Sequence, residues 1–454
     1  MSVQVRRAHS TQAFSTRGTS NCLQRVGVCS DRACKRGGGS LQNRRSFAAS
    51  FCSVCQLGNI MFDYSFFAPR QIVFGWGRRR ELGTLAAKLG RRALLVSGSR
   101  TLEANGSVEE LAAQLRAAGM DVLAFSAPSR EPEVRDVDHL TAEFRALSEG
   151  GDDVVVAVGG GSTIDLAKAA AALATNRHGE SVADFLEGVG RGLQITERPL
   201  PVIALPTTAG TGAEATKNSV ISSNTPTGST PPFKKSLRSE LMVPSLVLVD
   251  PELTVSLPPG VTAVTGMDAI TQLIESYISR RAAPIPQALC LHGLKLAIPA
   301  LPIAVQDGSS RTAREAMAHA ALLSGIALAN SGLGFAHGVA AALGVTCQIP
   351  HGLACAVLLP AALHVNLSVC TRQFAELERL FDPDSGHDTV AANAFVDRIE
   401  SLCALLEIPS RLRDLGVRQD QLADLVPGSR GNSMSGNPRE LSDHKLGQII
   451  NDLW

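Results

Sequence analysis

The chain lacks the features that mark membrane, secreted and nucleic-acid-binding proteins. No run of 18 apolar residues occurs in its 454 residues, and its start has no secretory hydrophobic segment. After residue 60 there is no Lys/Arg cluster of the kind that a nucleic-acid site needs. Five of the ten cysteines lie in residues 1–60, and the remaining five show no disulfide framework, which favours a reducing compartment. We therefore predict a cytoplasmic protein with no membrane or nucleic-acid partner.

The composition is typical of a globular protein with an unusual beginning. The chain is 44% hydrophobic and 19% charged, with a net charge of +1, and it is long enough for two domains. Residues 1–60 carry nine Lys/Arg and one acid, which leaves 34 basic and 41 acidic residues for the rest. We expect residues 1–60 to lie outside the fold, as a disordered extension or an organelle-targeting segment, or to precede a true start at Met61.

Strand and helix patterns alternate in the first part of the chain after residue 70. This alternation predicts a parallel, doubly wound, Rossmann-like sheet, which binds ligands at the carboxyl ends of its strands. Few strand signals follow Pro258-Pro259-Gly260, so we expect an α/β domain at 61–257 and an all-α domain at 258–454. The expected strands include 71–75, 92–97, 121–125 and 153–158, and the expected helices include 78–89, 111–118, 137–147, 313–330 and 390–406.

A glycine-rich turn follows the strand at 153–158 and leads into an alanine-rich helix. Such a turn lets backbone N–H groups approach a phosphate, and the helix N-terminus adds its positive end. The same pattern also serves as a plain connection between a strand and a helix. The candidate cofactor-binding residues of this turn are Gly159, Gly160, Gly161, Ser162 and Asp165.

A second polar turn follows the apolar stretch at 199–206, and we expect a helix after it. The hydroxyl groups of Thr207, Thr208 and Thr211 are candidates for contact with a phosphate, a ribose or a nicotinamide amide. Capping of the following helix is the structural alternative for these threonines.

A set of metal-ligand side chains occurs in the second half of the chain. His337 and His351 lie in a stretch of small apolar residues, where a histidine is more often a satisfied core residue. Upstream, an expected helix start at Gly266 places Asp268 and Gln272 one turn apart on one face. One carboxylate, one amide oxygen and two imidazoles suit a divalent metal that keeps an open position.

These motifs together resemble the iron-containing (group III) alcohol dehydrogenase family, from about Met61 to the C-terminus. The resemblance implies that Asp268, His337 and His351 are catalytic metal ligands. The family has His at the second ligand position, where this chain has Gln272, so a weaker amide oxygen stands in for an imidazole. A further family histidine near the substrate is replaced by Ala341. Iron(II) is the family's metal, and zinc would satisfy the same ligands.

The resemblance also implies a nicotinamide cofactor on the two polar turns, which match Gly-Gly-Gly-Ser-x-x-Asp and Pro-Thr-Thr-x-Gly-Thr-Gly-x-Glu. NAD-preferring relatives place Asp directly after the second strand, where it binds the ribose 2′-hydroxyl. This chain has Gly98 there, followed by Arg100. A missing carboxylate and a nearby guanidinium favour a 2′-phosphate, so NADP is preferred over NAD as the expected cofactor.

The implied reaction is hydride transfer between a small alcohol, or its aldehyde or ketone, and NAD(P)(H). Two alternatives stay open at this point. A metal-free reductase of maleylacetate type would explain Gln272 and Ala341, and a lyase related to dehydroquinate synthase shares the two-domain plan. The family also implies a homodimer.

Overall fold

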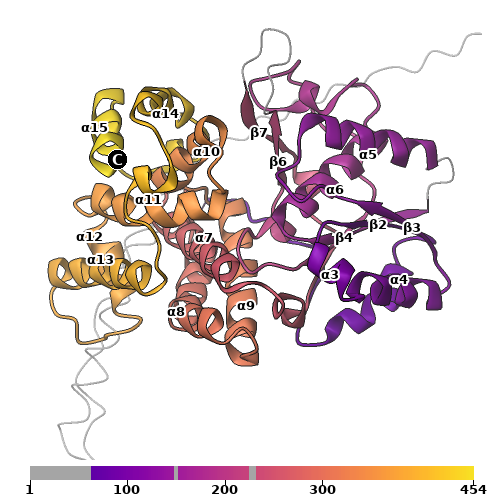
Figure 1. Cartoon of the computed structure of the whole chain (residues 1–454), viewed down its shortest axis with the longest axis horizontal. Coiled ribbons are helices and arrows are strands. Elements are labelled where there is room, and N and C mark those ends of the chain that lie inside the picture. The colour runs from indigo at the N-terminus through magenta and orange to yellow at the C-terminus, as the bar shows by residue number, and fades with distance from the viewer. Residues whose placement is uncertain (1–62, 148–151, 224–231) are drawn as a thin grey trace, which may run out of the picture. The chain divides into compact units, whose positions relative to one another are not determined.

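The computed structural model of the chain describes residues 63–147, 152–223 and 232–454. The expected N-terminal extension, residues 1–60, lies outside these residues. Residues from Tyr64 to Trp454 form one compact unit. Within this unit a parallel sheet is followed by a set of helices, as Figure 1 shows.

Six parallel strands form the sheet. Their order is β1–β8–β5–β4–β2–β3, and each neighbouring pair is parallel, which confirms the predicted sheet. The direction in which strands are added reverses after β3. The chain places β3 on one side of β2, and then adds β4, β5 and β8 in turn on the other side. The strands are β1 (Ile72–Phe74), β2 (Arg92–Ser97), β3 (Asp121–Ser126), β4 (Asp153–Gly159), β5 (Val202–Pro206) and β8 (Leu246–Val249).

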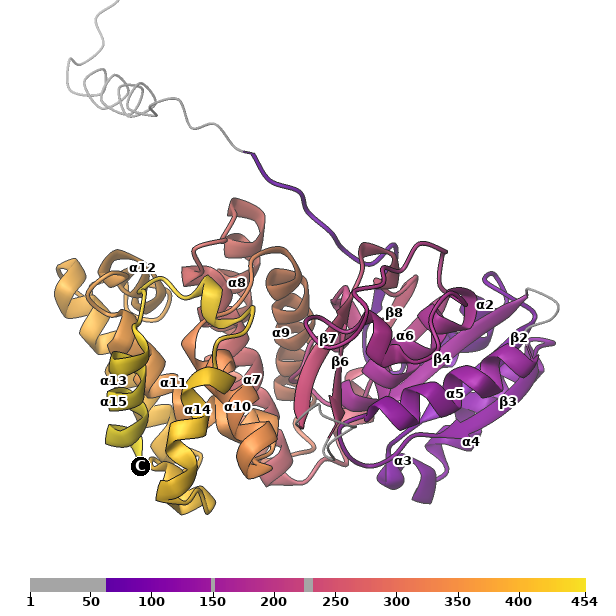
Figure 2. The same cartoon turned by 90° about the horizontal axis from the view of Figure 1, so that it is seen from above.

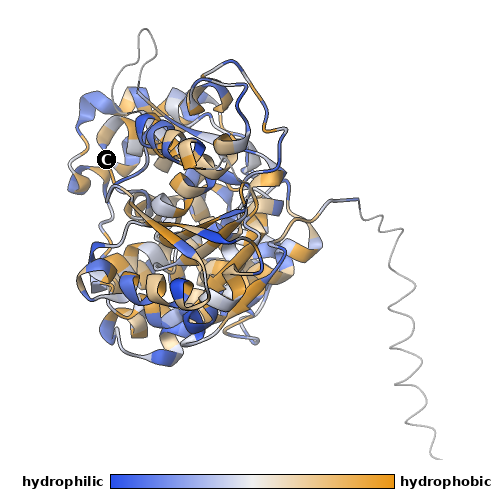
Figure 3. Ribbon diagram, turned by 90° about the vertical axis from the view of Figure 1, so that its right-hand side faces the viewer, coloured by the Kyte–Doolittle hydropathy of each residue, from blue (hydrophilic) through white to orange (hydrophobic). Residues whose placement is uncertain are grey.

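Helices cover both faces of the sheet because successive strand residues point to opposite sides. In β2, Leu94 packs into the core under α5 (Val134–Leu147) and α6 (Gly161–Thr175). Its neighbour Leu95 packs into the core with α4 (Ser107–Ala117). Figure 1 shows the strands between α5 and α4, and Figure 3 shows the hydrophobic colouring of strands in this region. The four inner strands, β2, β4, β5 and β8, read as nearly continuous apolar runs because both of their faces are buried.

The helix expected after the second polar turn is absent, and that prediction is wrong. The chain forms only a 3-10 turn at Ala213–Ala215 and then the antiparallel strands β6 (Asn218–Ser223) and β7 (Phe233–Arg238). Gly212 has a φ of 62°, and a Cβ atom there would lie 2.4 Å from the Cα of Gly325. The 3-10 turn that follows Gly212 ends at Thr216, whose backbone is extended, and the chain passes into β6 instead of a helix.

The part of the unit that follows β8 is helical, as predicted. Its first helix, α7, begins at Pro259, so the expected helix start at Gly266 is wrong. A proline at the first helical position is favoured because its missing N–H has no partner there in any case. The remaining helices are α8 (Pro284–Gln306), α9 (Arg311–Asn330), α10 (Phe335–Cys347), α11 (His351–Asn366), α12 (Thr371–Glu378), α13 (Asp388–Leu405), α14 (Leu422–Gly428) and α15 (Asp443–Leu453).

One helix, α8, is long and apolar enough to cross a membrane by length and composition alone. Core helices of globular proteins pass the same test. Cys290, Leu294 and Leu301 of α8 are fully buried in the same core as residues of α7, α9 and α13. One face of α8 thus packs in the helical core, whereas Ile285 and Ile303 are exposed.

Candidate active site between the sheet and the helices

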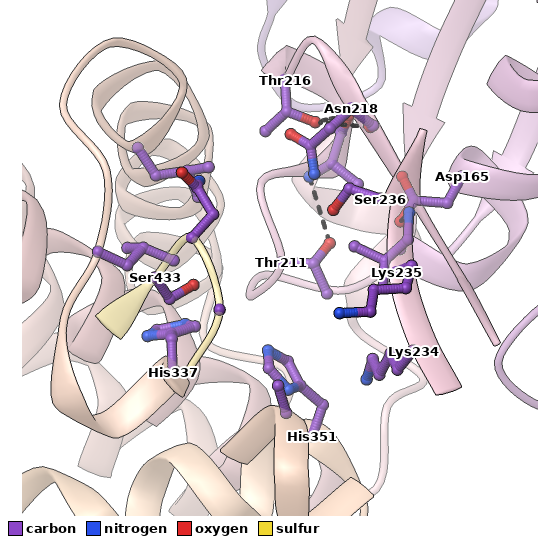
Figure 4. A pocket seen from close by; sticks show the side chains of 18 of the residues that line it. Asp165, Thr211, Thr216, Asn218, Lys234, Lys235, Ser236, His337, His351 and Ser433 are labelled. Atoms are coloured by element: carbon purple, nitrogen blue, oxygen red, sulfur yellow. Dashed lines mark hydrogen bonds between the residues drawn. The ribbon is translucent and has the colours of Figure 1, made fainter. Parts of the chain in front are cut away.

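A cavity of about 330 Å³ lies between the carboxyl ends of the strands and the helical part. Gly161, Ser162 and Thr211 line it from the α/β side. Figure 4 shows His337 and His351 on the helical side, with Lys234 and Lys235 of β7 beside them. This is the place where doubly wound sheets bind ligands.

The glycine-rich turn packs tightly against the second polar turn. Strand β4 ends at Gly159 and helix α6 begins at Gly161. A Cβ atom on Gly161 would lie 2.6 Å from the Oγ1 atom of Thr211, so only glycine allows this close approach. The backbone N–H of Thr207 donates to the carbonyl of Gly159 at 3.0 Å. The two turns therefore form one continuous polar edge at the start of a 15-residue helix.

The structure places the candidate cofactor residues in three groups. Gly161, Ser162, Asp165 and Thr211 line the cavity, whereas Gly159, Gly160, Thr207 and Thr208 lie in the same turns without lining it. Gly98 and Arg100 follow β2 at the reversal of strand order, where the N–H of Gly98 donates to the carbonyl of Val158 at 3.3 Å.

The carboxylate of Asp165 is held by contacts within the α/β part of the chain. Its Oδ2 atom accepts a hydrogen bond from the backbone N–H of Val220 at 3.0 Å, and its Oδ1 atom lies 3.6 Å from the Nζ atom of Lys168. Burial raises the pKa of Asp165. These contacts tie the first turns of α6 to β6, so Asp165 shapes the wall of the cavity.

Three of the predicted metal ligands converge on the helical side of the cavity. Single ligand atoms of Asp268, His337, His351 and Cys355 all lie within 4.8 Å of one another. The Nε2 atom of His337 is 3.3 Å from the Oδ1 atom of Asp268. Helix α7 contributes the aspartate, α10 contributes His337, and α11 begins at His351.

Three buried polar atoms of these residues make no hydrogen bond within the described part of the chain. They are Asp268 Oδ1, His337 Nε2 and His351 Nδ1, and the first two face each other as a 3.3 Å ion pair. Buried polar atoms without a hydrogen bond are costly and rare. The closeness of the four side chains, and the mixture of carboxylate and imidazole donors, fit a bound divalent cation.

A carboxylate that the sequence reasoning did not select orients His337. The Oε2 atom of Glu275 lies 2.7 Å from the Nδ1 atom of His337 and accepts from the N–H of Gly334 at 3.0 Å. Its Oε1 atom accepts from the N–H of Ala336 at 2.6 Å. Glu275 thereby caps the N-terminus of α10 and leaves Nε2 of His337 free to bind a cation.

Gln272 is already engaged by hydrogen bonds. Its Oε1 atom accepts from the Oγ atom of Ser324 at 2.7 Å, and its Nε2 atom donates to the carbonyl of Thr211 at 3.3 Å. The amide lines the cavity and bridges α9 to the second polar turn. Its assignment as a metal ligand stays a prediction.

The ionisation of the cluster follows from its burial. Burial, with a contribution from Lys234, lowers the pKa of His351 to about 4, so this imidazole is neutral. Burial disfavours the charged form of His337, but Cys355, Asp268 and Glu275 outweigh it, and its pKa rises. Burial raises the pKa of the Cys355 thiol to about 12. In the absence of a metal, the positive charge of His337 thus faces the carboxylates of Asp268 and Glu275, and the Cys355 thiol keeps its proton.

Two site residues, Glu275 and Cys355, were missed by the sequence reasoning. Glu275 lies seven residues after Asp268, and Cys355 lies four residues after His351. Both spacings place the side chains on the same helical face as the predicted ligand. Helical spacing from each predicted ligand is the signal that could have found them. Ala341 also lines the cavity, so no imidazole stands there.

Comparison with known proteins shows one family along nearly the whole described chain. Residues 69–251 match the model of the iron-containing alcohol dehydrogenases, and residues 262–454 match the C-terminal model of the same family. The NAD-dependent methanol dehydrogenase of Bacillus methanolicus is 33% identical over 390 residues, which cover 85% of this chain and 98% of that protein. The 1,3-propanediol dehydrogenase of Citrobacter freundii is 35% identical over 87% of this chain and 99% of its own.

Solved structures agree with this match. The crystal structure of a 1,3-propanediol oxidoreductase has a TM-score of 0.79 at 32% identity, covering 87% of this chain and all of that one. A sulfoacetaldehyde reductase from Bifidobacterium kashiwanohense, in complex with NAD+, has a TM-score of 0.75 at 33% identity, covering 87% and 99%.

Proposed function

The chain belongs to the iron-containing alcohol dehydrogenase family, and from this premise we propose which of its residues carry the reaction. It is an oxidoreductase that interconverts an alcohol and an aldehyde or ketone with a nicotinamide cofactor. The observation that supports the residue assignment is that the two polar turns and the cluster of Asp268, His337 and His351 line one cavity.

The metal-binding residues are Asp268, His337 and His351. A divalent metal, iron in this family, supplies Lewis-acid polarisation of the substrate oxygen when it is bound. Asp268 contributes negative charge, the two histidines contribute neutral nitrogen, and Glu275 fixes the orientation of His337. With Ala341 in the cavity wall, this position supplies no imidazole for the substrate proton, which would leave through water.

The edge formed by the two polar turns would hold the nicotinamide cofactor. The N-terminus of α6 and the glycine backbone would bind its phosphates, and Ser162 and Thr211 would contribute hydroxyl groups from the cavity wall. The pairing of β4 with β5 holds the two turns beside each other.

Catalytic turnover separates this function from its alternatives. A dehydrogenase oxidises NADPH or NADH in proportion to the aldehyde added over many cycles, whereas a lyase of the dehydroquinate synthase type returns the cofactor unchanged after each cycle. We expect continuous loss of the reduced-cofactor absorbance with small aldehydes. Loss with an activated keto acid only, and without metal, would instead indicate the maleylacetate type.

Cofactor preference depends on the residues after β2. A Cβ atom at Gly98 would lie 2.0 Å from the Oγ1 atom of Thr163, so an aspartate does not fit at this position. Arg100 is exposed at the start of α3 (Arg100–Ala104), after the N-cap Ser99. The relatives named for their cofactor use NAD, whereas a chain that lacks this aspartate and carries Arg100 is suited to NADP.

Replacing Arg100 by alanine tests this preference. A charge-assisted hydrogen bond contributes about 1.5–3 kcal/mol, so we expect KM for NADPH to rise about ten- to a hundredfold. KM for NADH should hardly change. Arg91→Ala is the matched control, since this exposed arginine lies at the opposite end of β2. A wild-type preference for NADH, with Arg100→Ala without effect, would contradict the assignment.

A further inference from the structure

We propose that Cys355 supplies the fourth protein ligand of the metal, in place of Gln272. The site would then consist of one carboxylate, two imidazoles and one thiolate. This inference rests on the proposed function, because it takes a metal bound at Asp268, His337 and His351 as given.

The position of Cys355 supports the assignment. Its ligand atom belongs to the same group as those of the three other residues, within 4.8 Å of each. The Sγ atom lies 3.7 Å from the Nε2 atom of His351, one helical turn earlier in α11. Cys355 is fully buried. Buried, unpartnered atoms of Asp268 and His337 belong to the same cluster, so the thiol does not stand alone.

Gln272 is less suited to bind the metal than its sequence position implies. Its Oε1 atom accepts a hydrogen bond from Ser324, and its Nε2 atom donates to Thr211. Turning the amide oxygen toward the cluster would leave the buried Ser324 hydroxyl with only its bond to the carbonyl of Ala321. An amide oxygen is also a neutral and harder ligand than a thiolate, which Zn²⁺ and Fe²⁺ bind through sulfur.

Binding through Cys355 has a defined proton balance. The thiol loses its proton to solvent as the metal–sulfur bond forms, and the oxidation state of the metal does not change. The thiolate and the Asp268 carboxylate together neutralise the charge of a divalent ion. A chain that lacks the usual second histidine thus retains four protein donors, and Gln272 is released for its structural role between α9 and the second polar turn.

The absorption spectrum of the cobalt-substituted protein tests whether Cys355 binds the metal. Wild-type protein loaded with Co²⁺ should show an intense near-ultraviolet band of sulfur-to-cobalt charge transfer. Cys355→Ala should abolish the band, whereas Gln272→Ala should keep it. Cys290→Ala is the matched control, because Cys290 is an equally buried thiol of the helical core on α8. That control should keep both the band and the bound cobalt.

X-ray absorption spectroscopy of the zinc-loaded wild-type protein also tests for a sulfur ligand. It needs no substitution, so its result does not depend on whether a variant folds. One sulfur neighbour at about 2.3 Å is expected beside nitrogen and oxygen neighbours. A bound metal with only nitrogen and oxygen neighbours, and no charge-transfer band, would overturn the role of Cys355 and leave the proposed function standing. Protein that binds no metal would overturn both.

Discussion

Replacing Asp268 by alanine is expected to lower kcat/KM for aldehyde reduction about a thousandfold or more. Asp268 is almost fully buried, and it is the carboxylate of the unpartnered cluster. Without it the remaining donors hold a divalent ion less tightly, and Lewis-acid stabilisation worth several kcal/mol is lost. About 4 kcal/mol corresponds to the thousandfold loss. Steady-state kinetics with NADPH and a small aldehyde measures the effect.

Two further measurements make that result specific. The metal content of Asp268→Ala should fall together with its activity, while its circular dichroism spectrum stays close to that of the wild type. Asp397→Ala is the matched control, since Asp397 is an exposed acid on α13 and lies outside the cavity. Unchanged activity in Asp268→Ala would remove this aspartate from the site.

Replacing Lys168 by methionine is expected to lower the free energy of unfolding by about 3–5 kcal/mol. The side chain of Lys168 is fully buried in α6. Its Nζ atom donates to the carbonyl of Ala213 and the hydroxyl of Thr216, both at 2.9 Å, and also to the carbonyl of Asn218. Methionine keeps most of the apolar stem and removes only the ammonium group, so the acceptors and the nearby Asp165 lose their cationic partner.

Urea denaturation followed by circular dichroism measures this change. Lys88→Met is the control, because Lys88 is exposed just after α2 (Leu82–Ala86) and should shift the unfolding midpoint very little. Since Lys168 links α6 to the segment after the second polar turn, we also expect weaker cofactor binding in Lys168→Met. Equal midpoints for the two variants would show that this buried network contributes little to stability.

The sheet could be predicted because its strands have a strong local signal. Strand β2, for example, is a buried apolar run followed by glycine, and the prediction of 92–97 matches its bounds. The polar turn after β4 was equally visible, because three successive glycines at the end of a buried strand are uncommon without a close approach. The cluster of Asp268, His337 and His351 was found through the family motifs, which already encode how distant helices pack together.

The features that the sequence did not predict depend on contacts between segments far apart in the chain. The second polar turn leads into β6 instead of a helix, and the Lys168 ammonium that bonds Ala213 and Thr216 there comes from the distant helix α6. Cys355 and Glu275 were overlooked because each was read alone, although their helical spacing from His351 and Asp268 was available. The hydrogen-bond partners of the Gln272 amide, Ser324 and Thr211, lie on other elements of the fold.

The most direct test of the central claim is the metal content of anaerobically purified protein, with aldehyde-dependent NADPH oxidation before and after chelation. We predict one tightly bound iron or zinc per chain, loss of activity when it is removed, and recovery when it is added back. Full activity in metal-free protein would contradict a metal site at Asp268, His337 and His351.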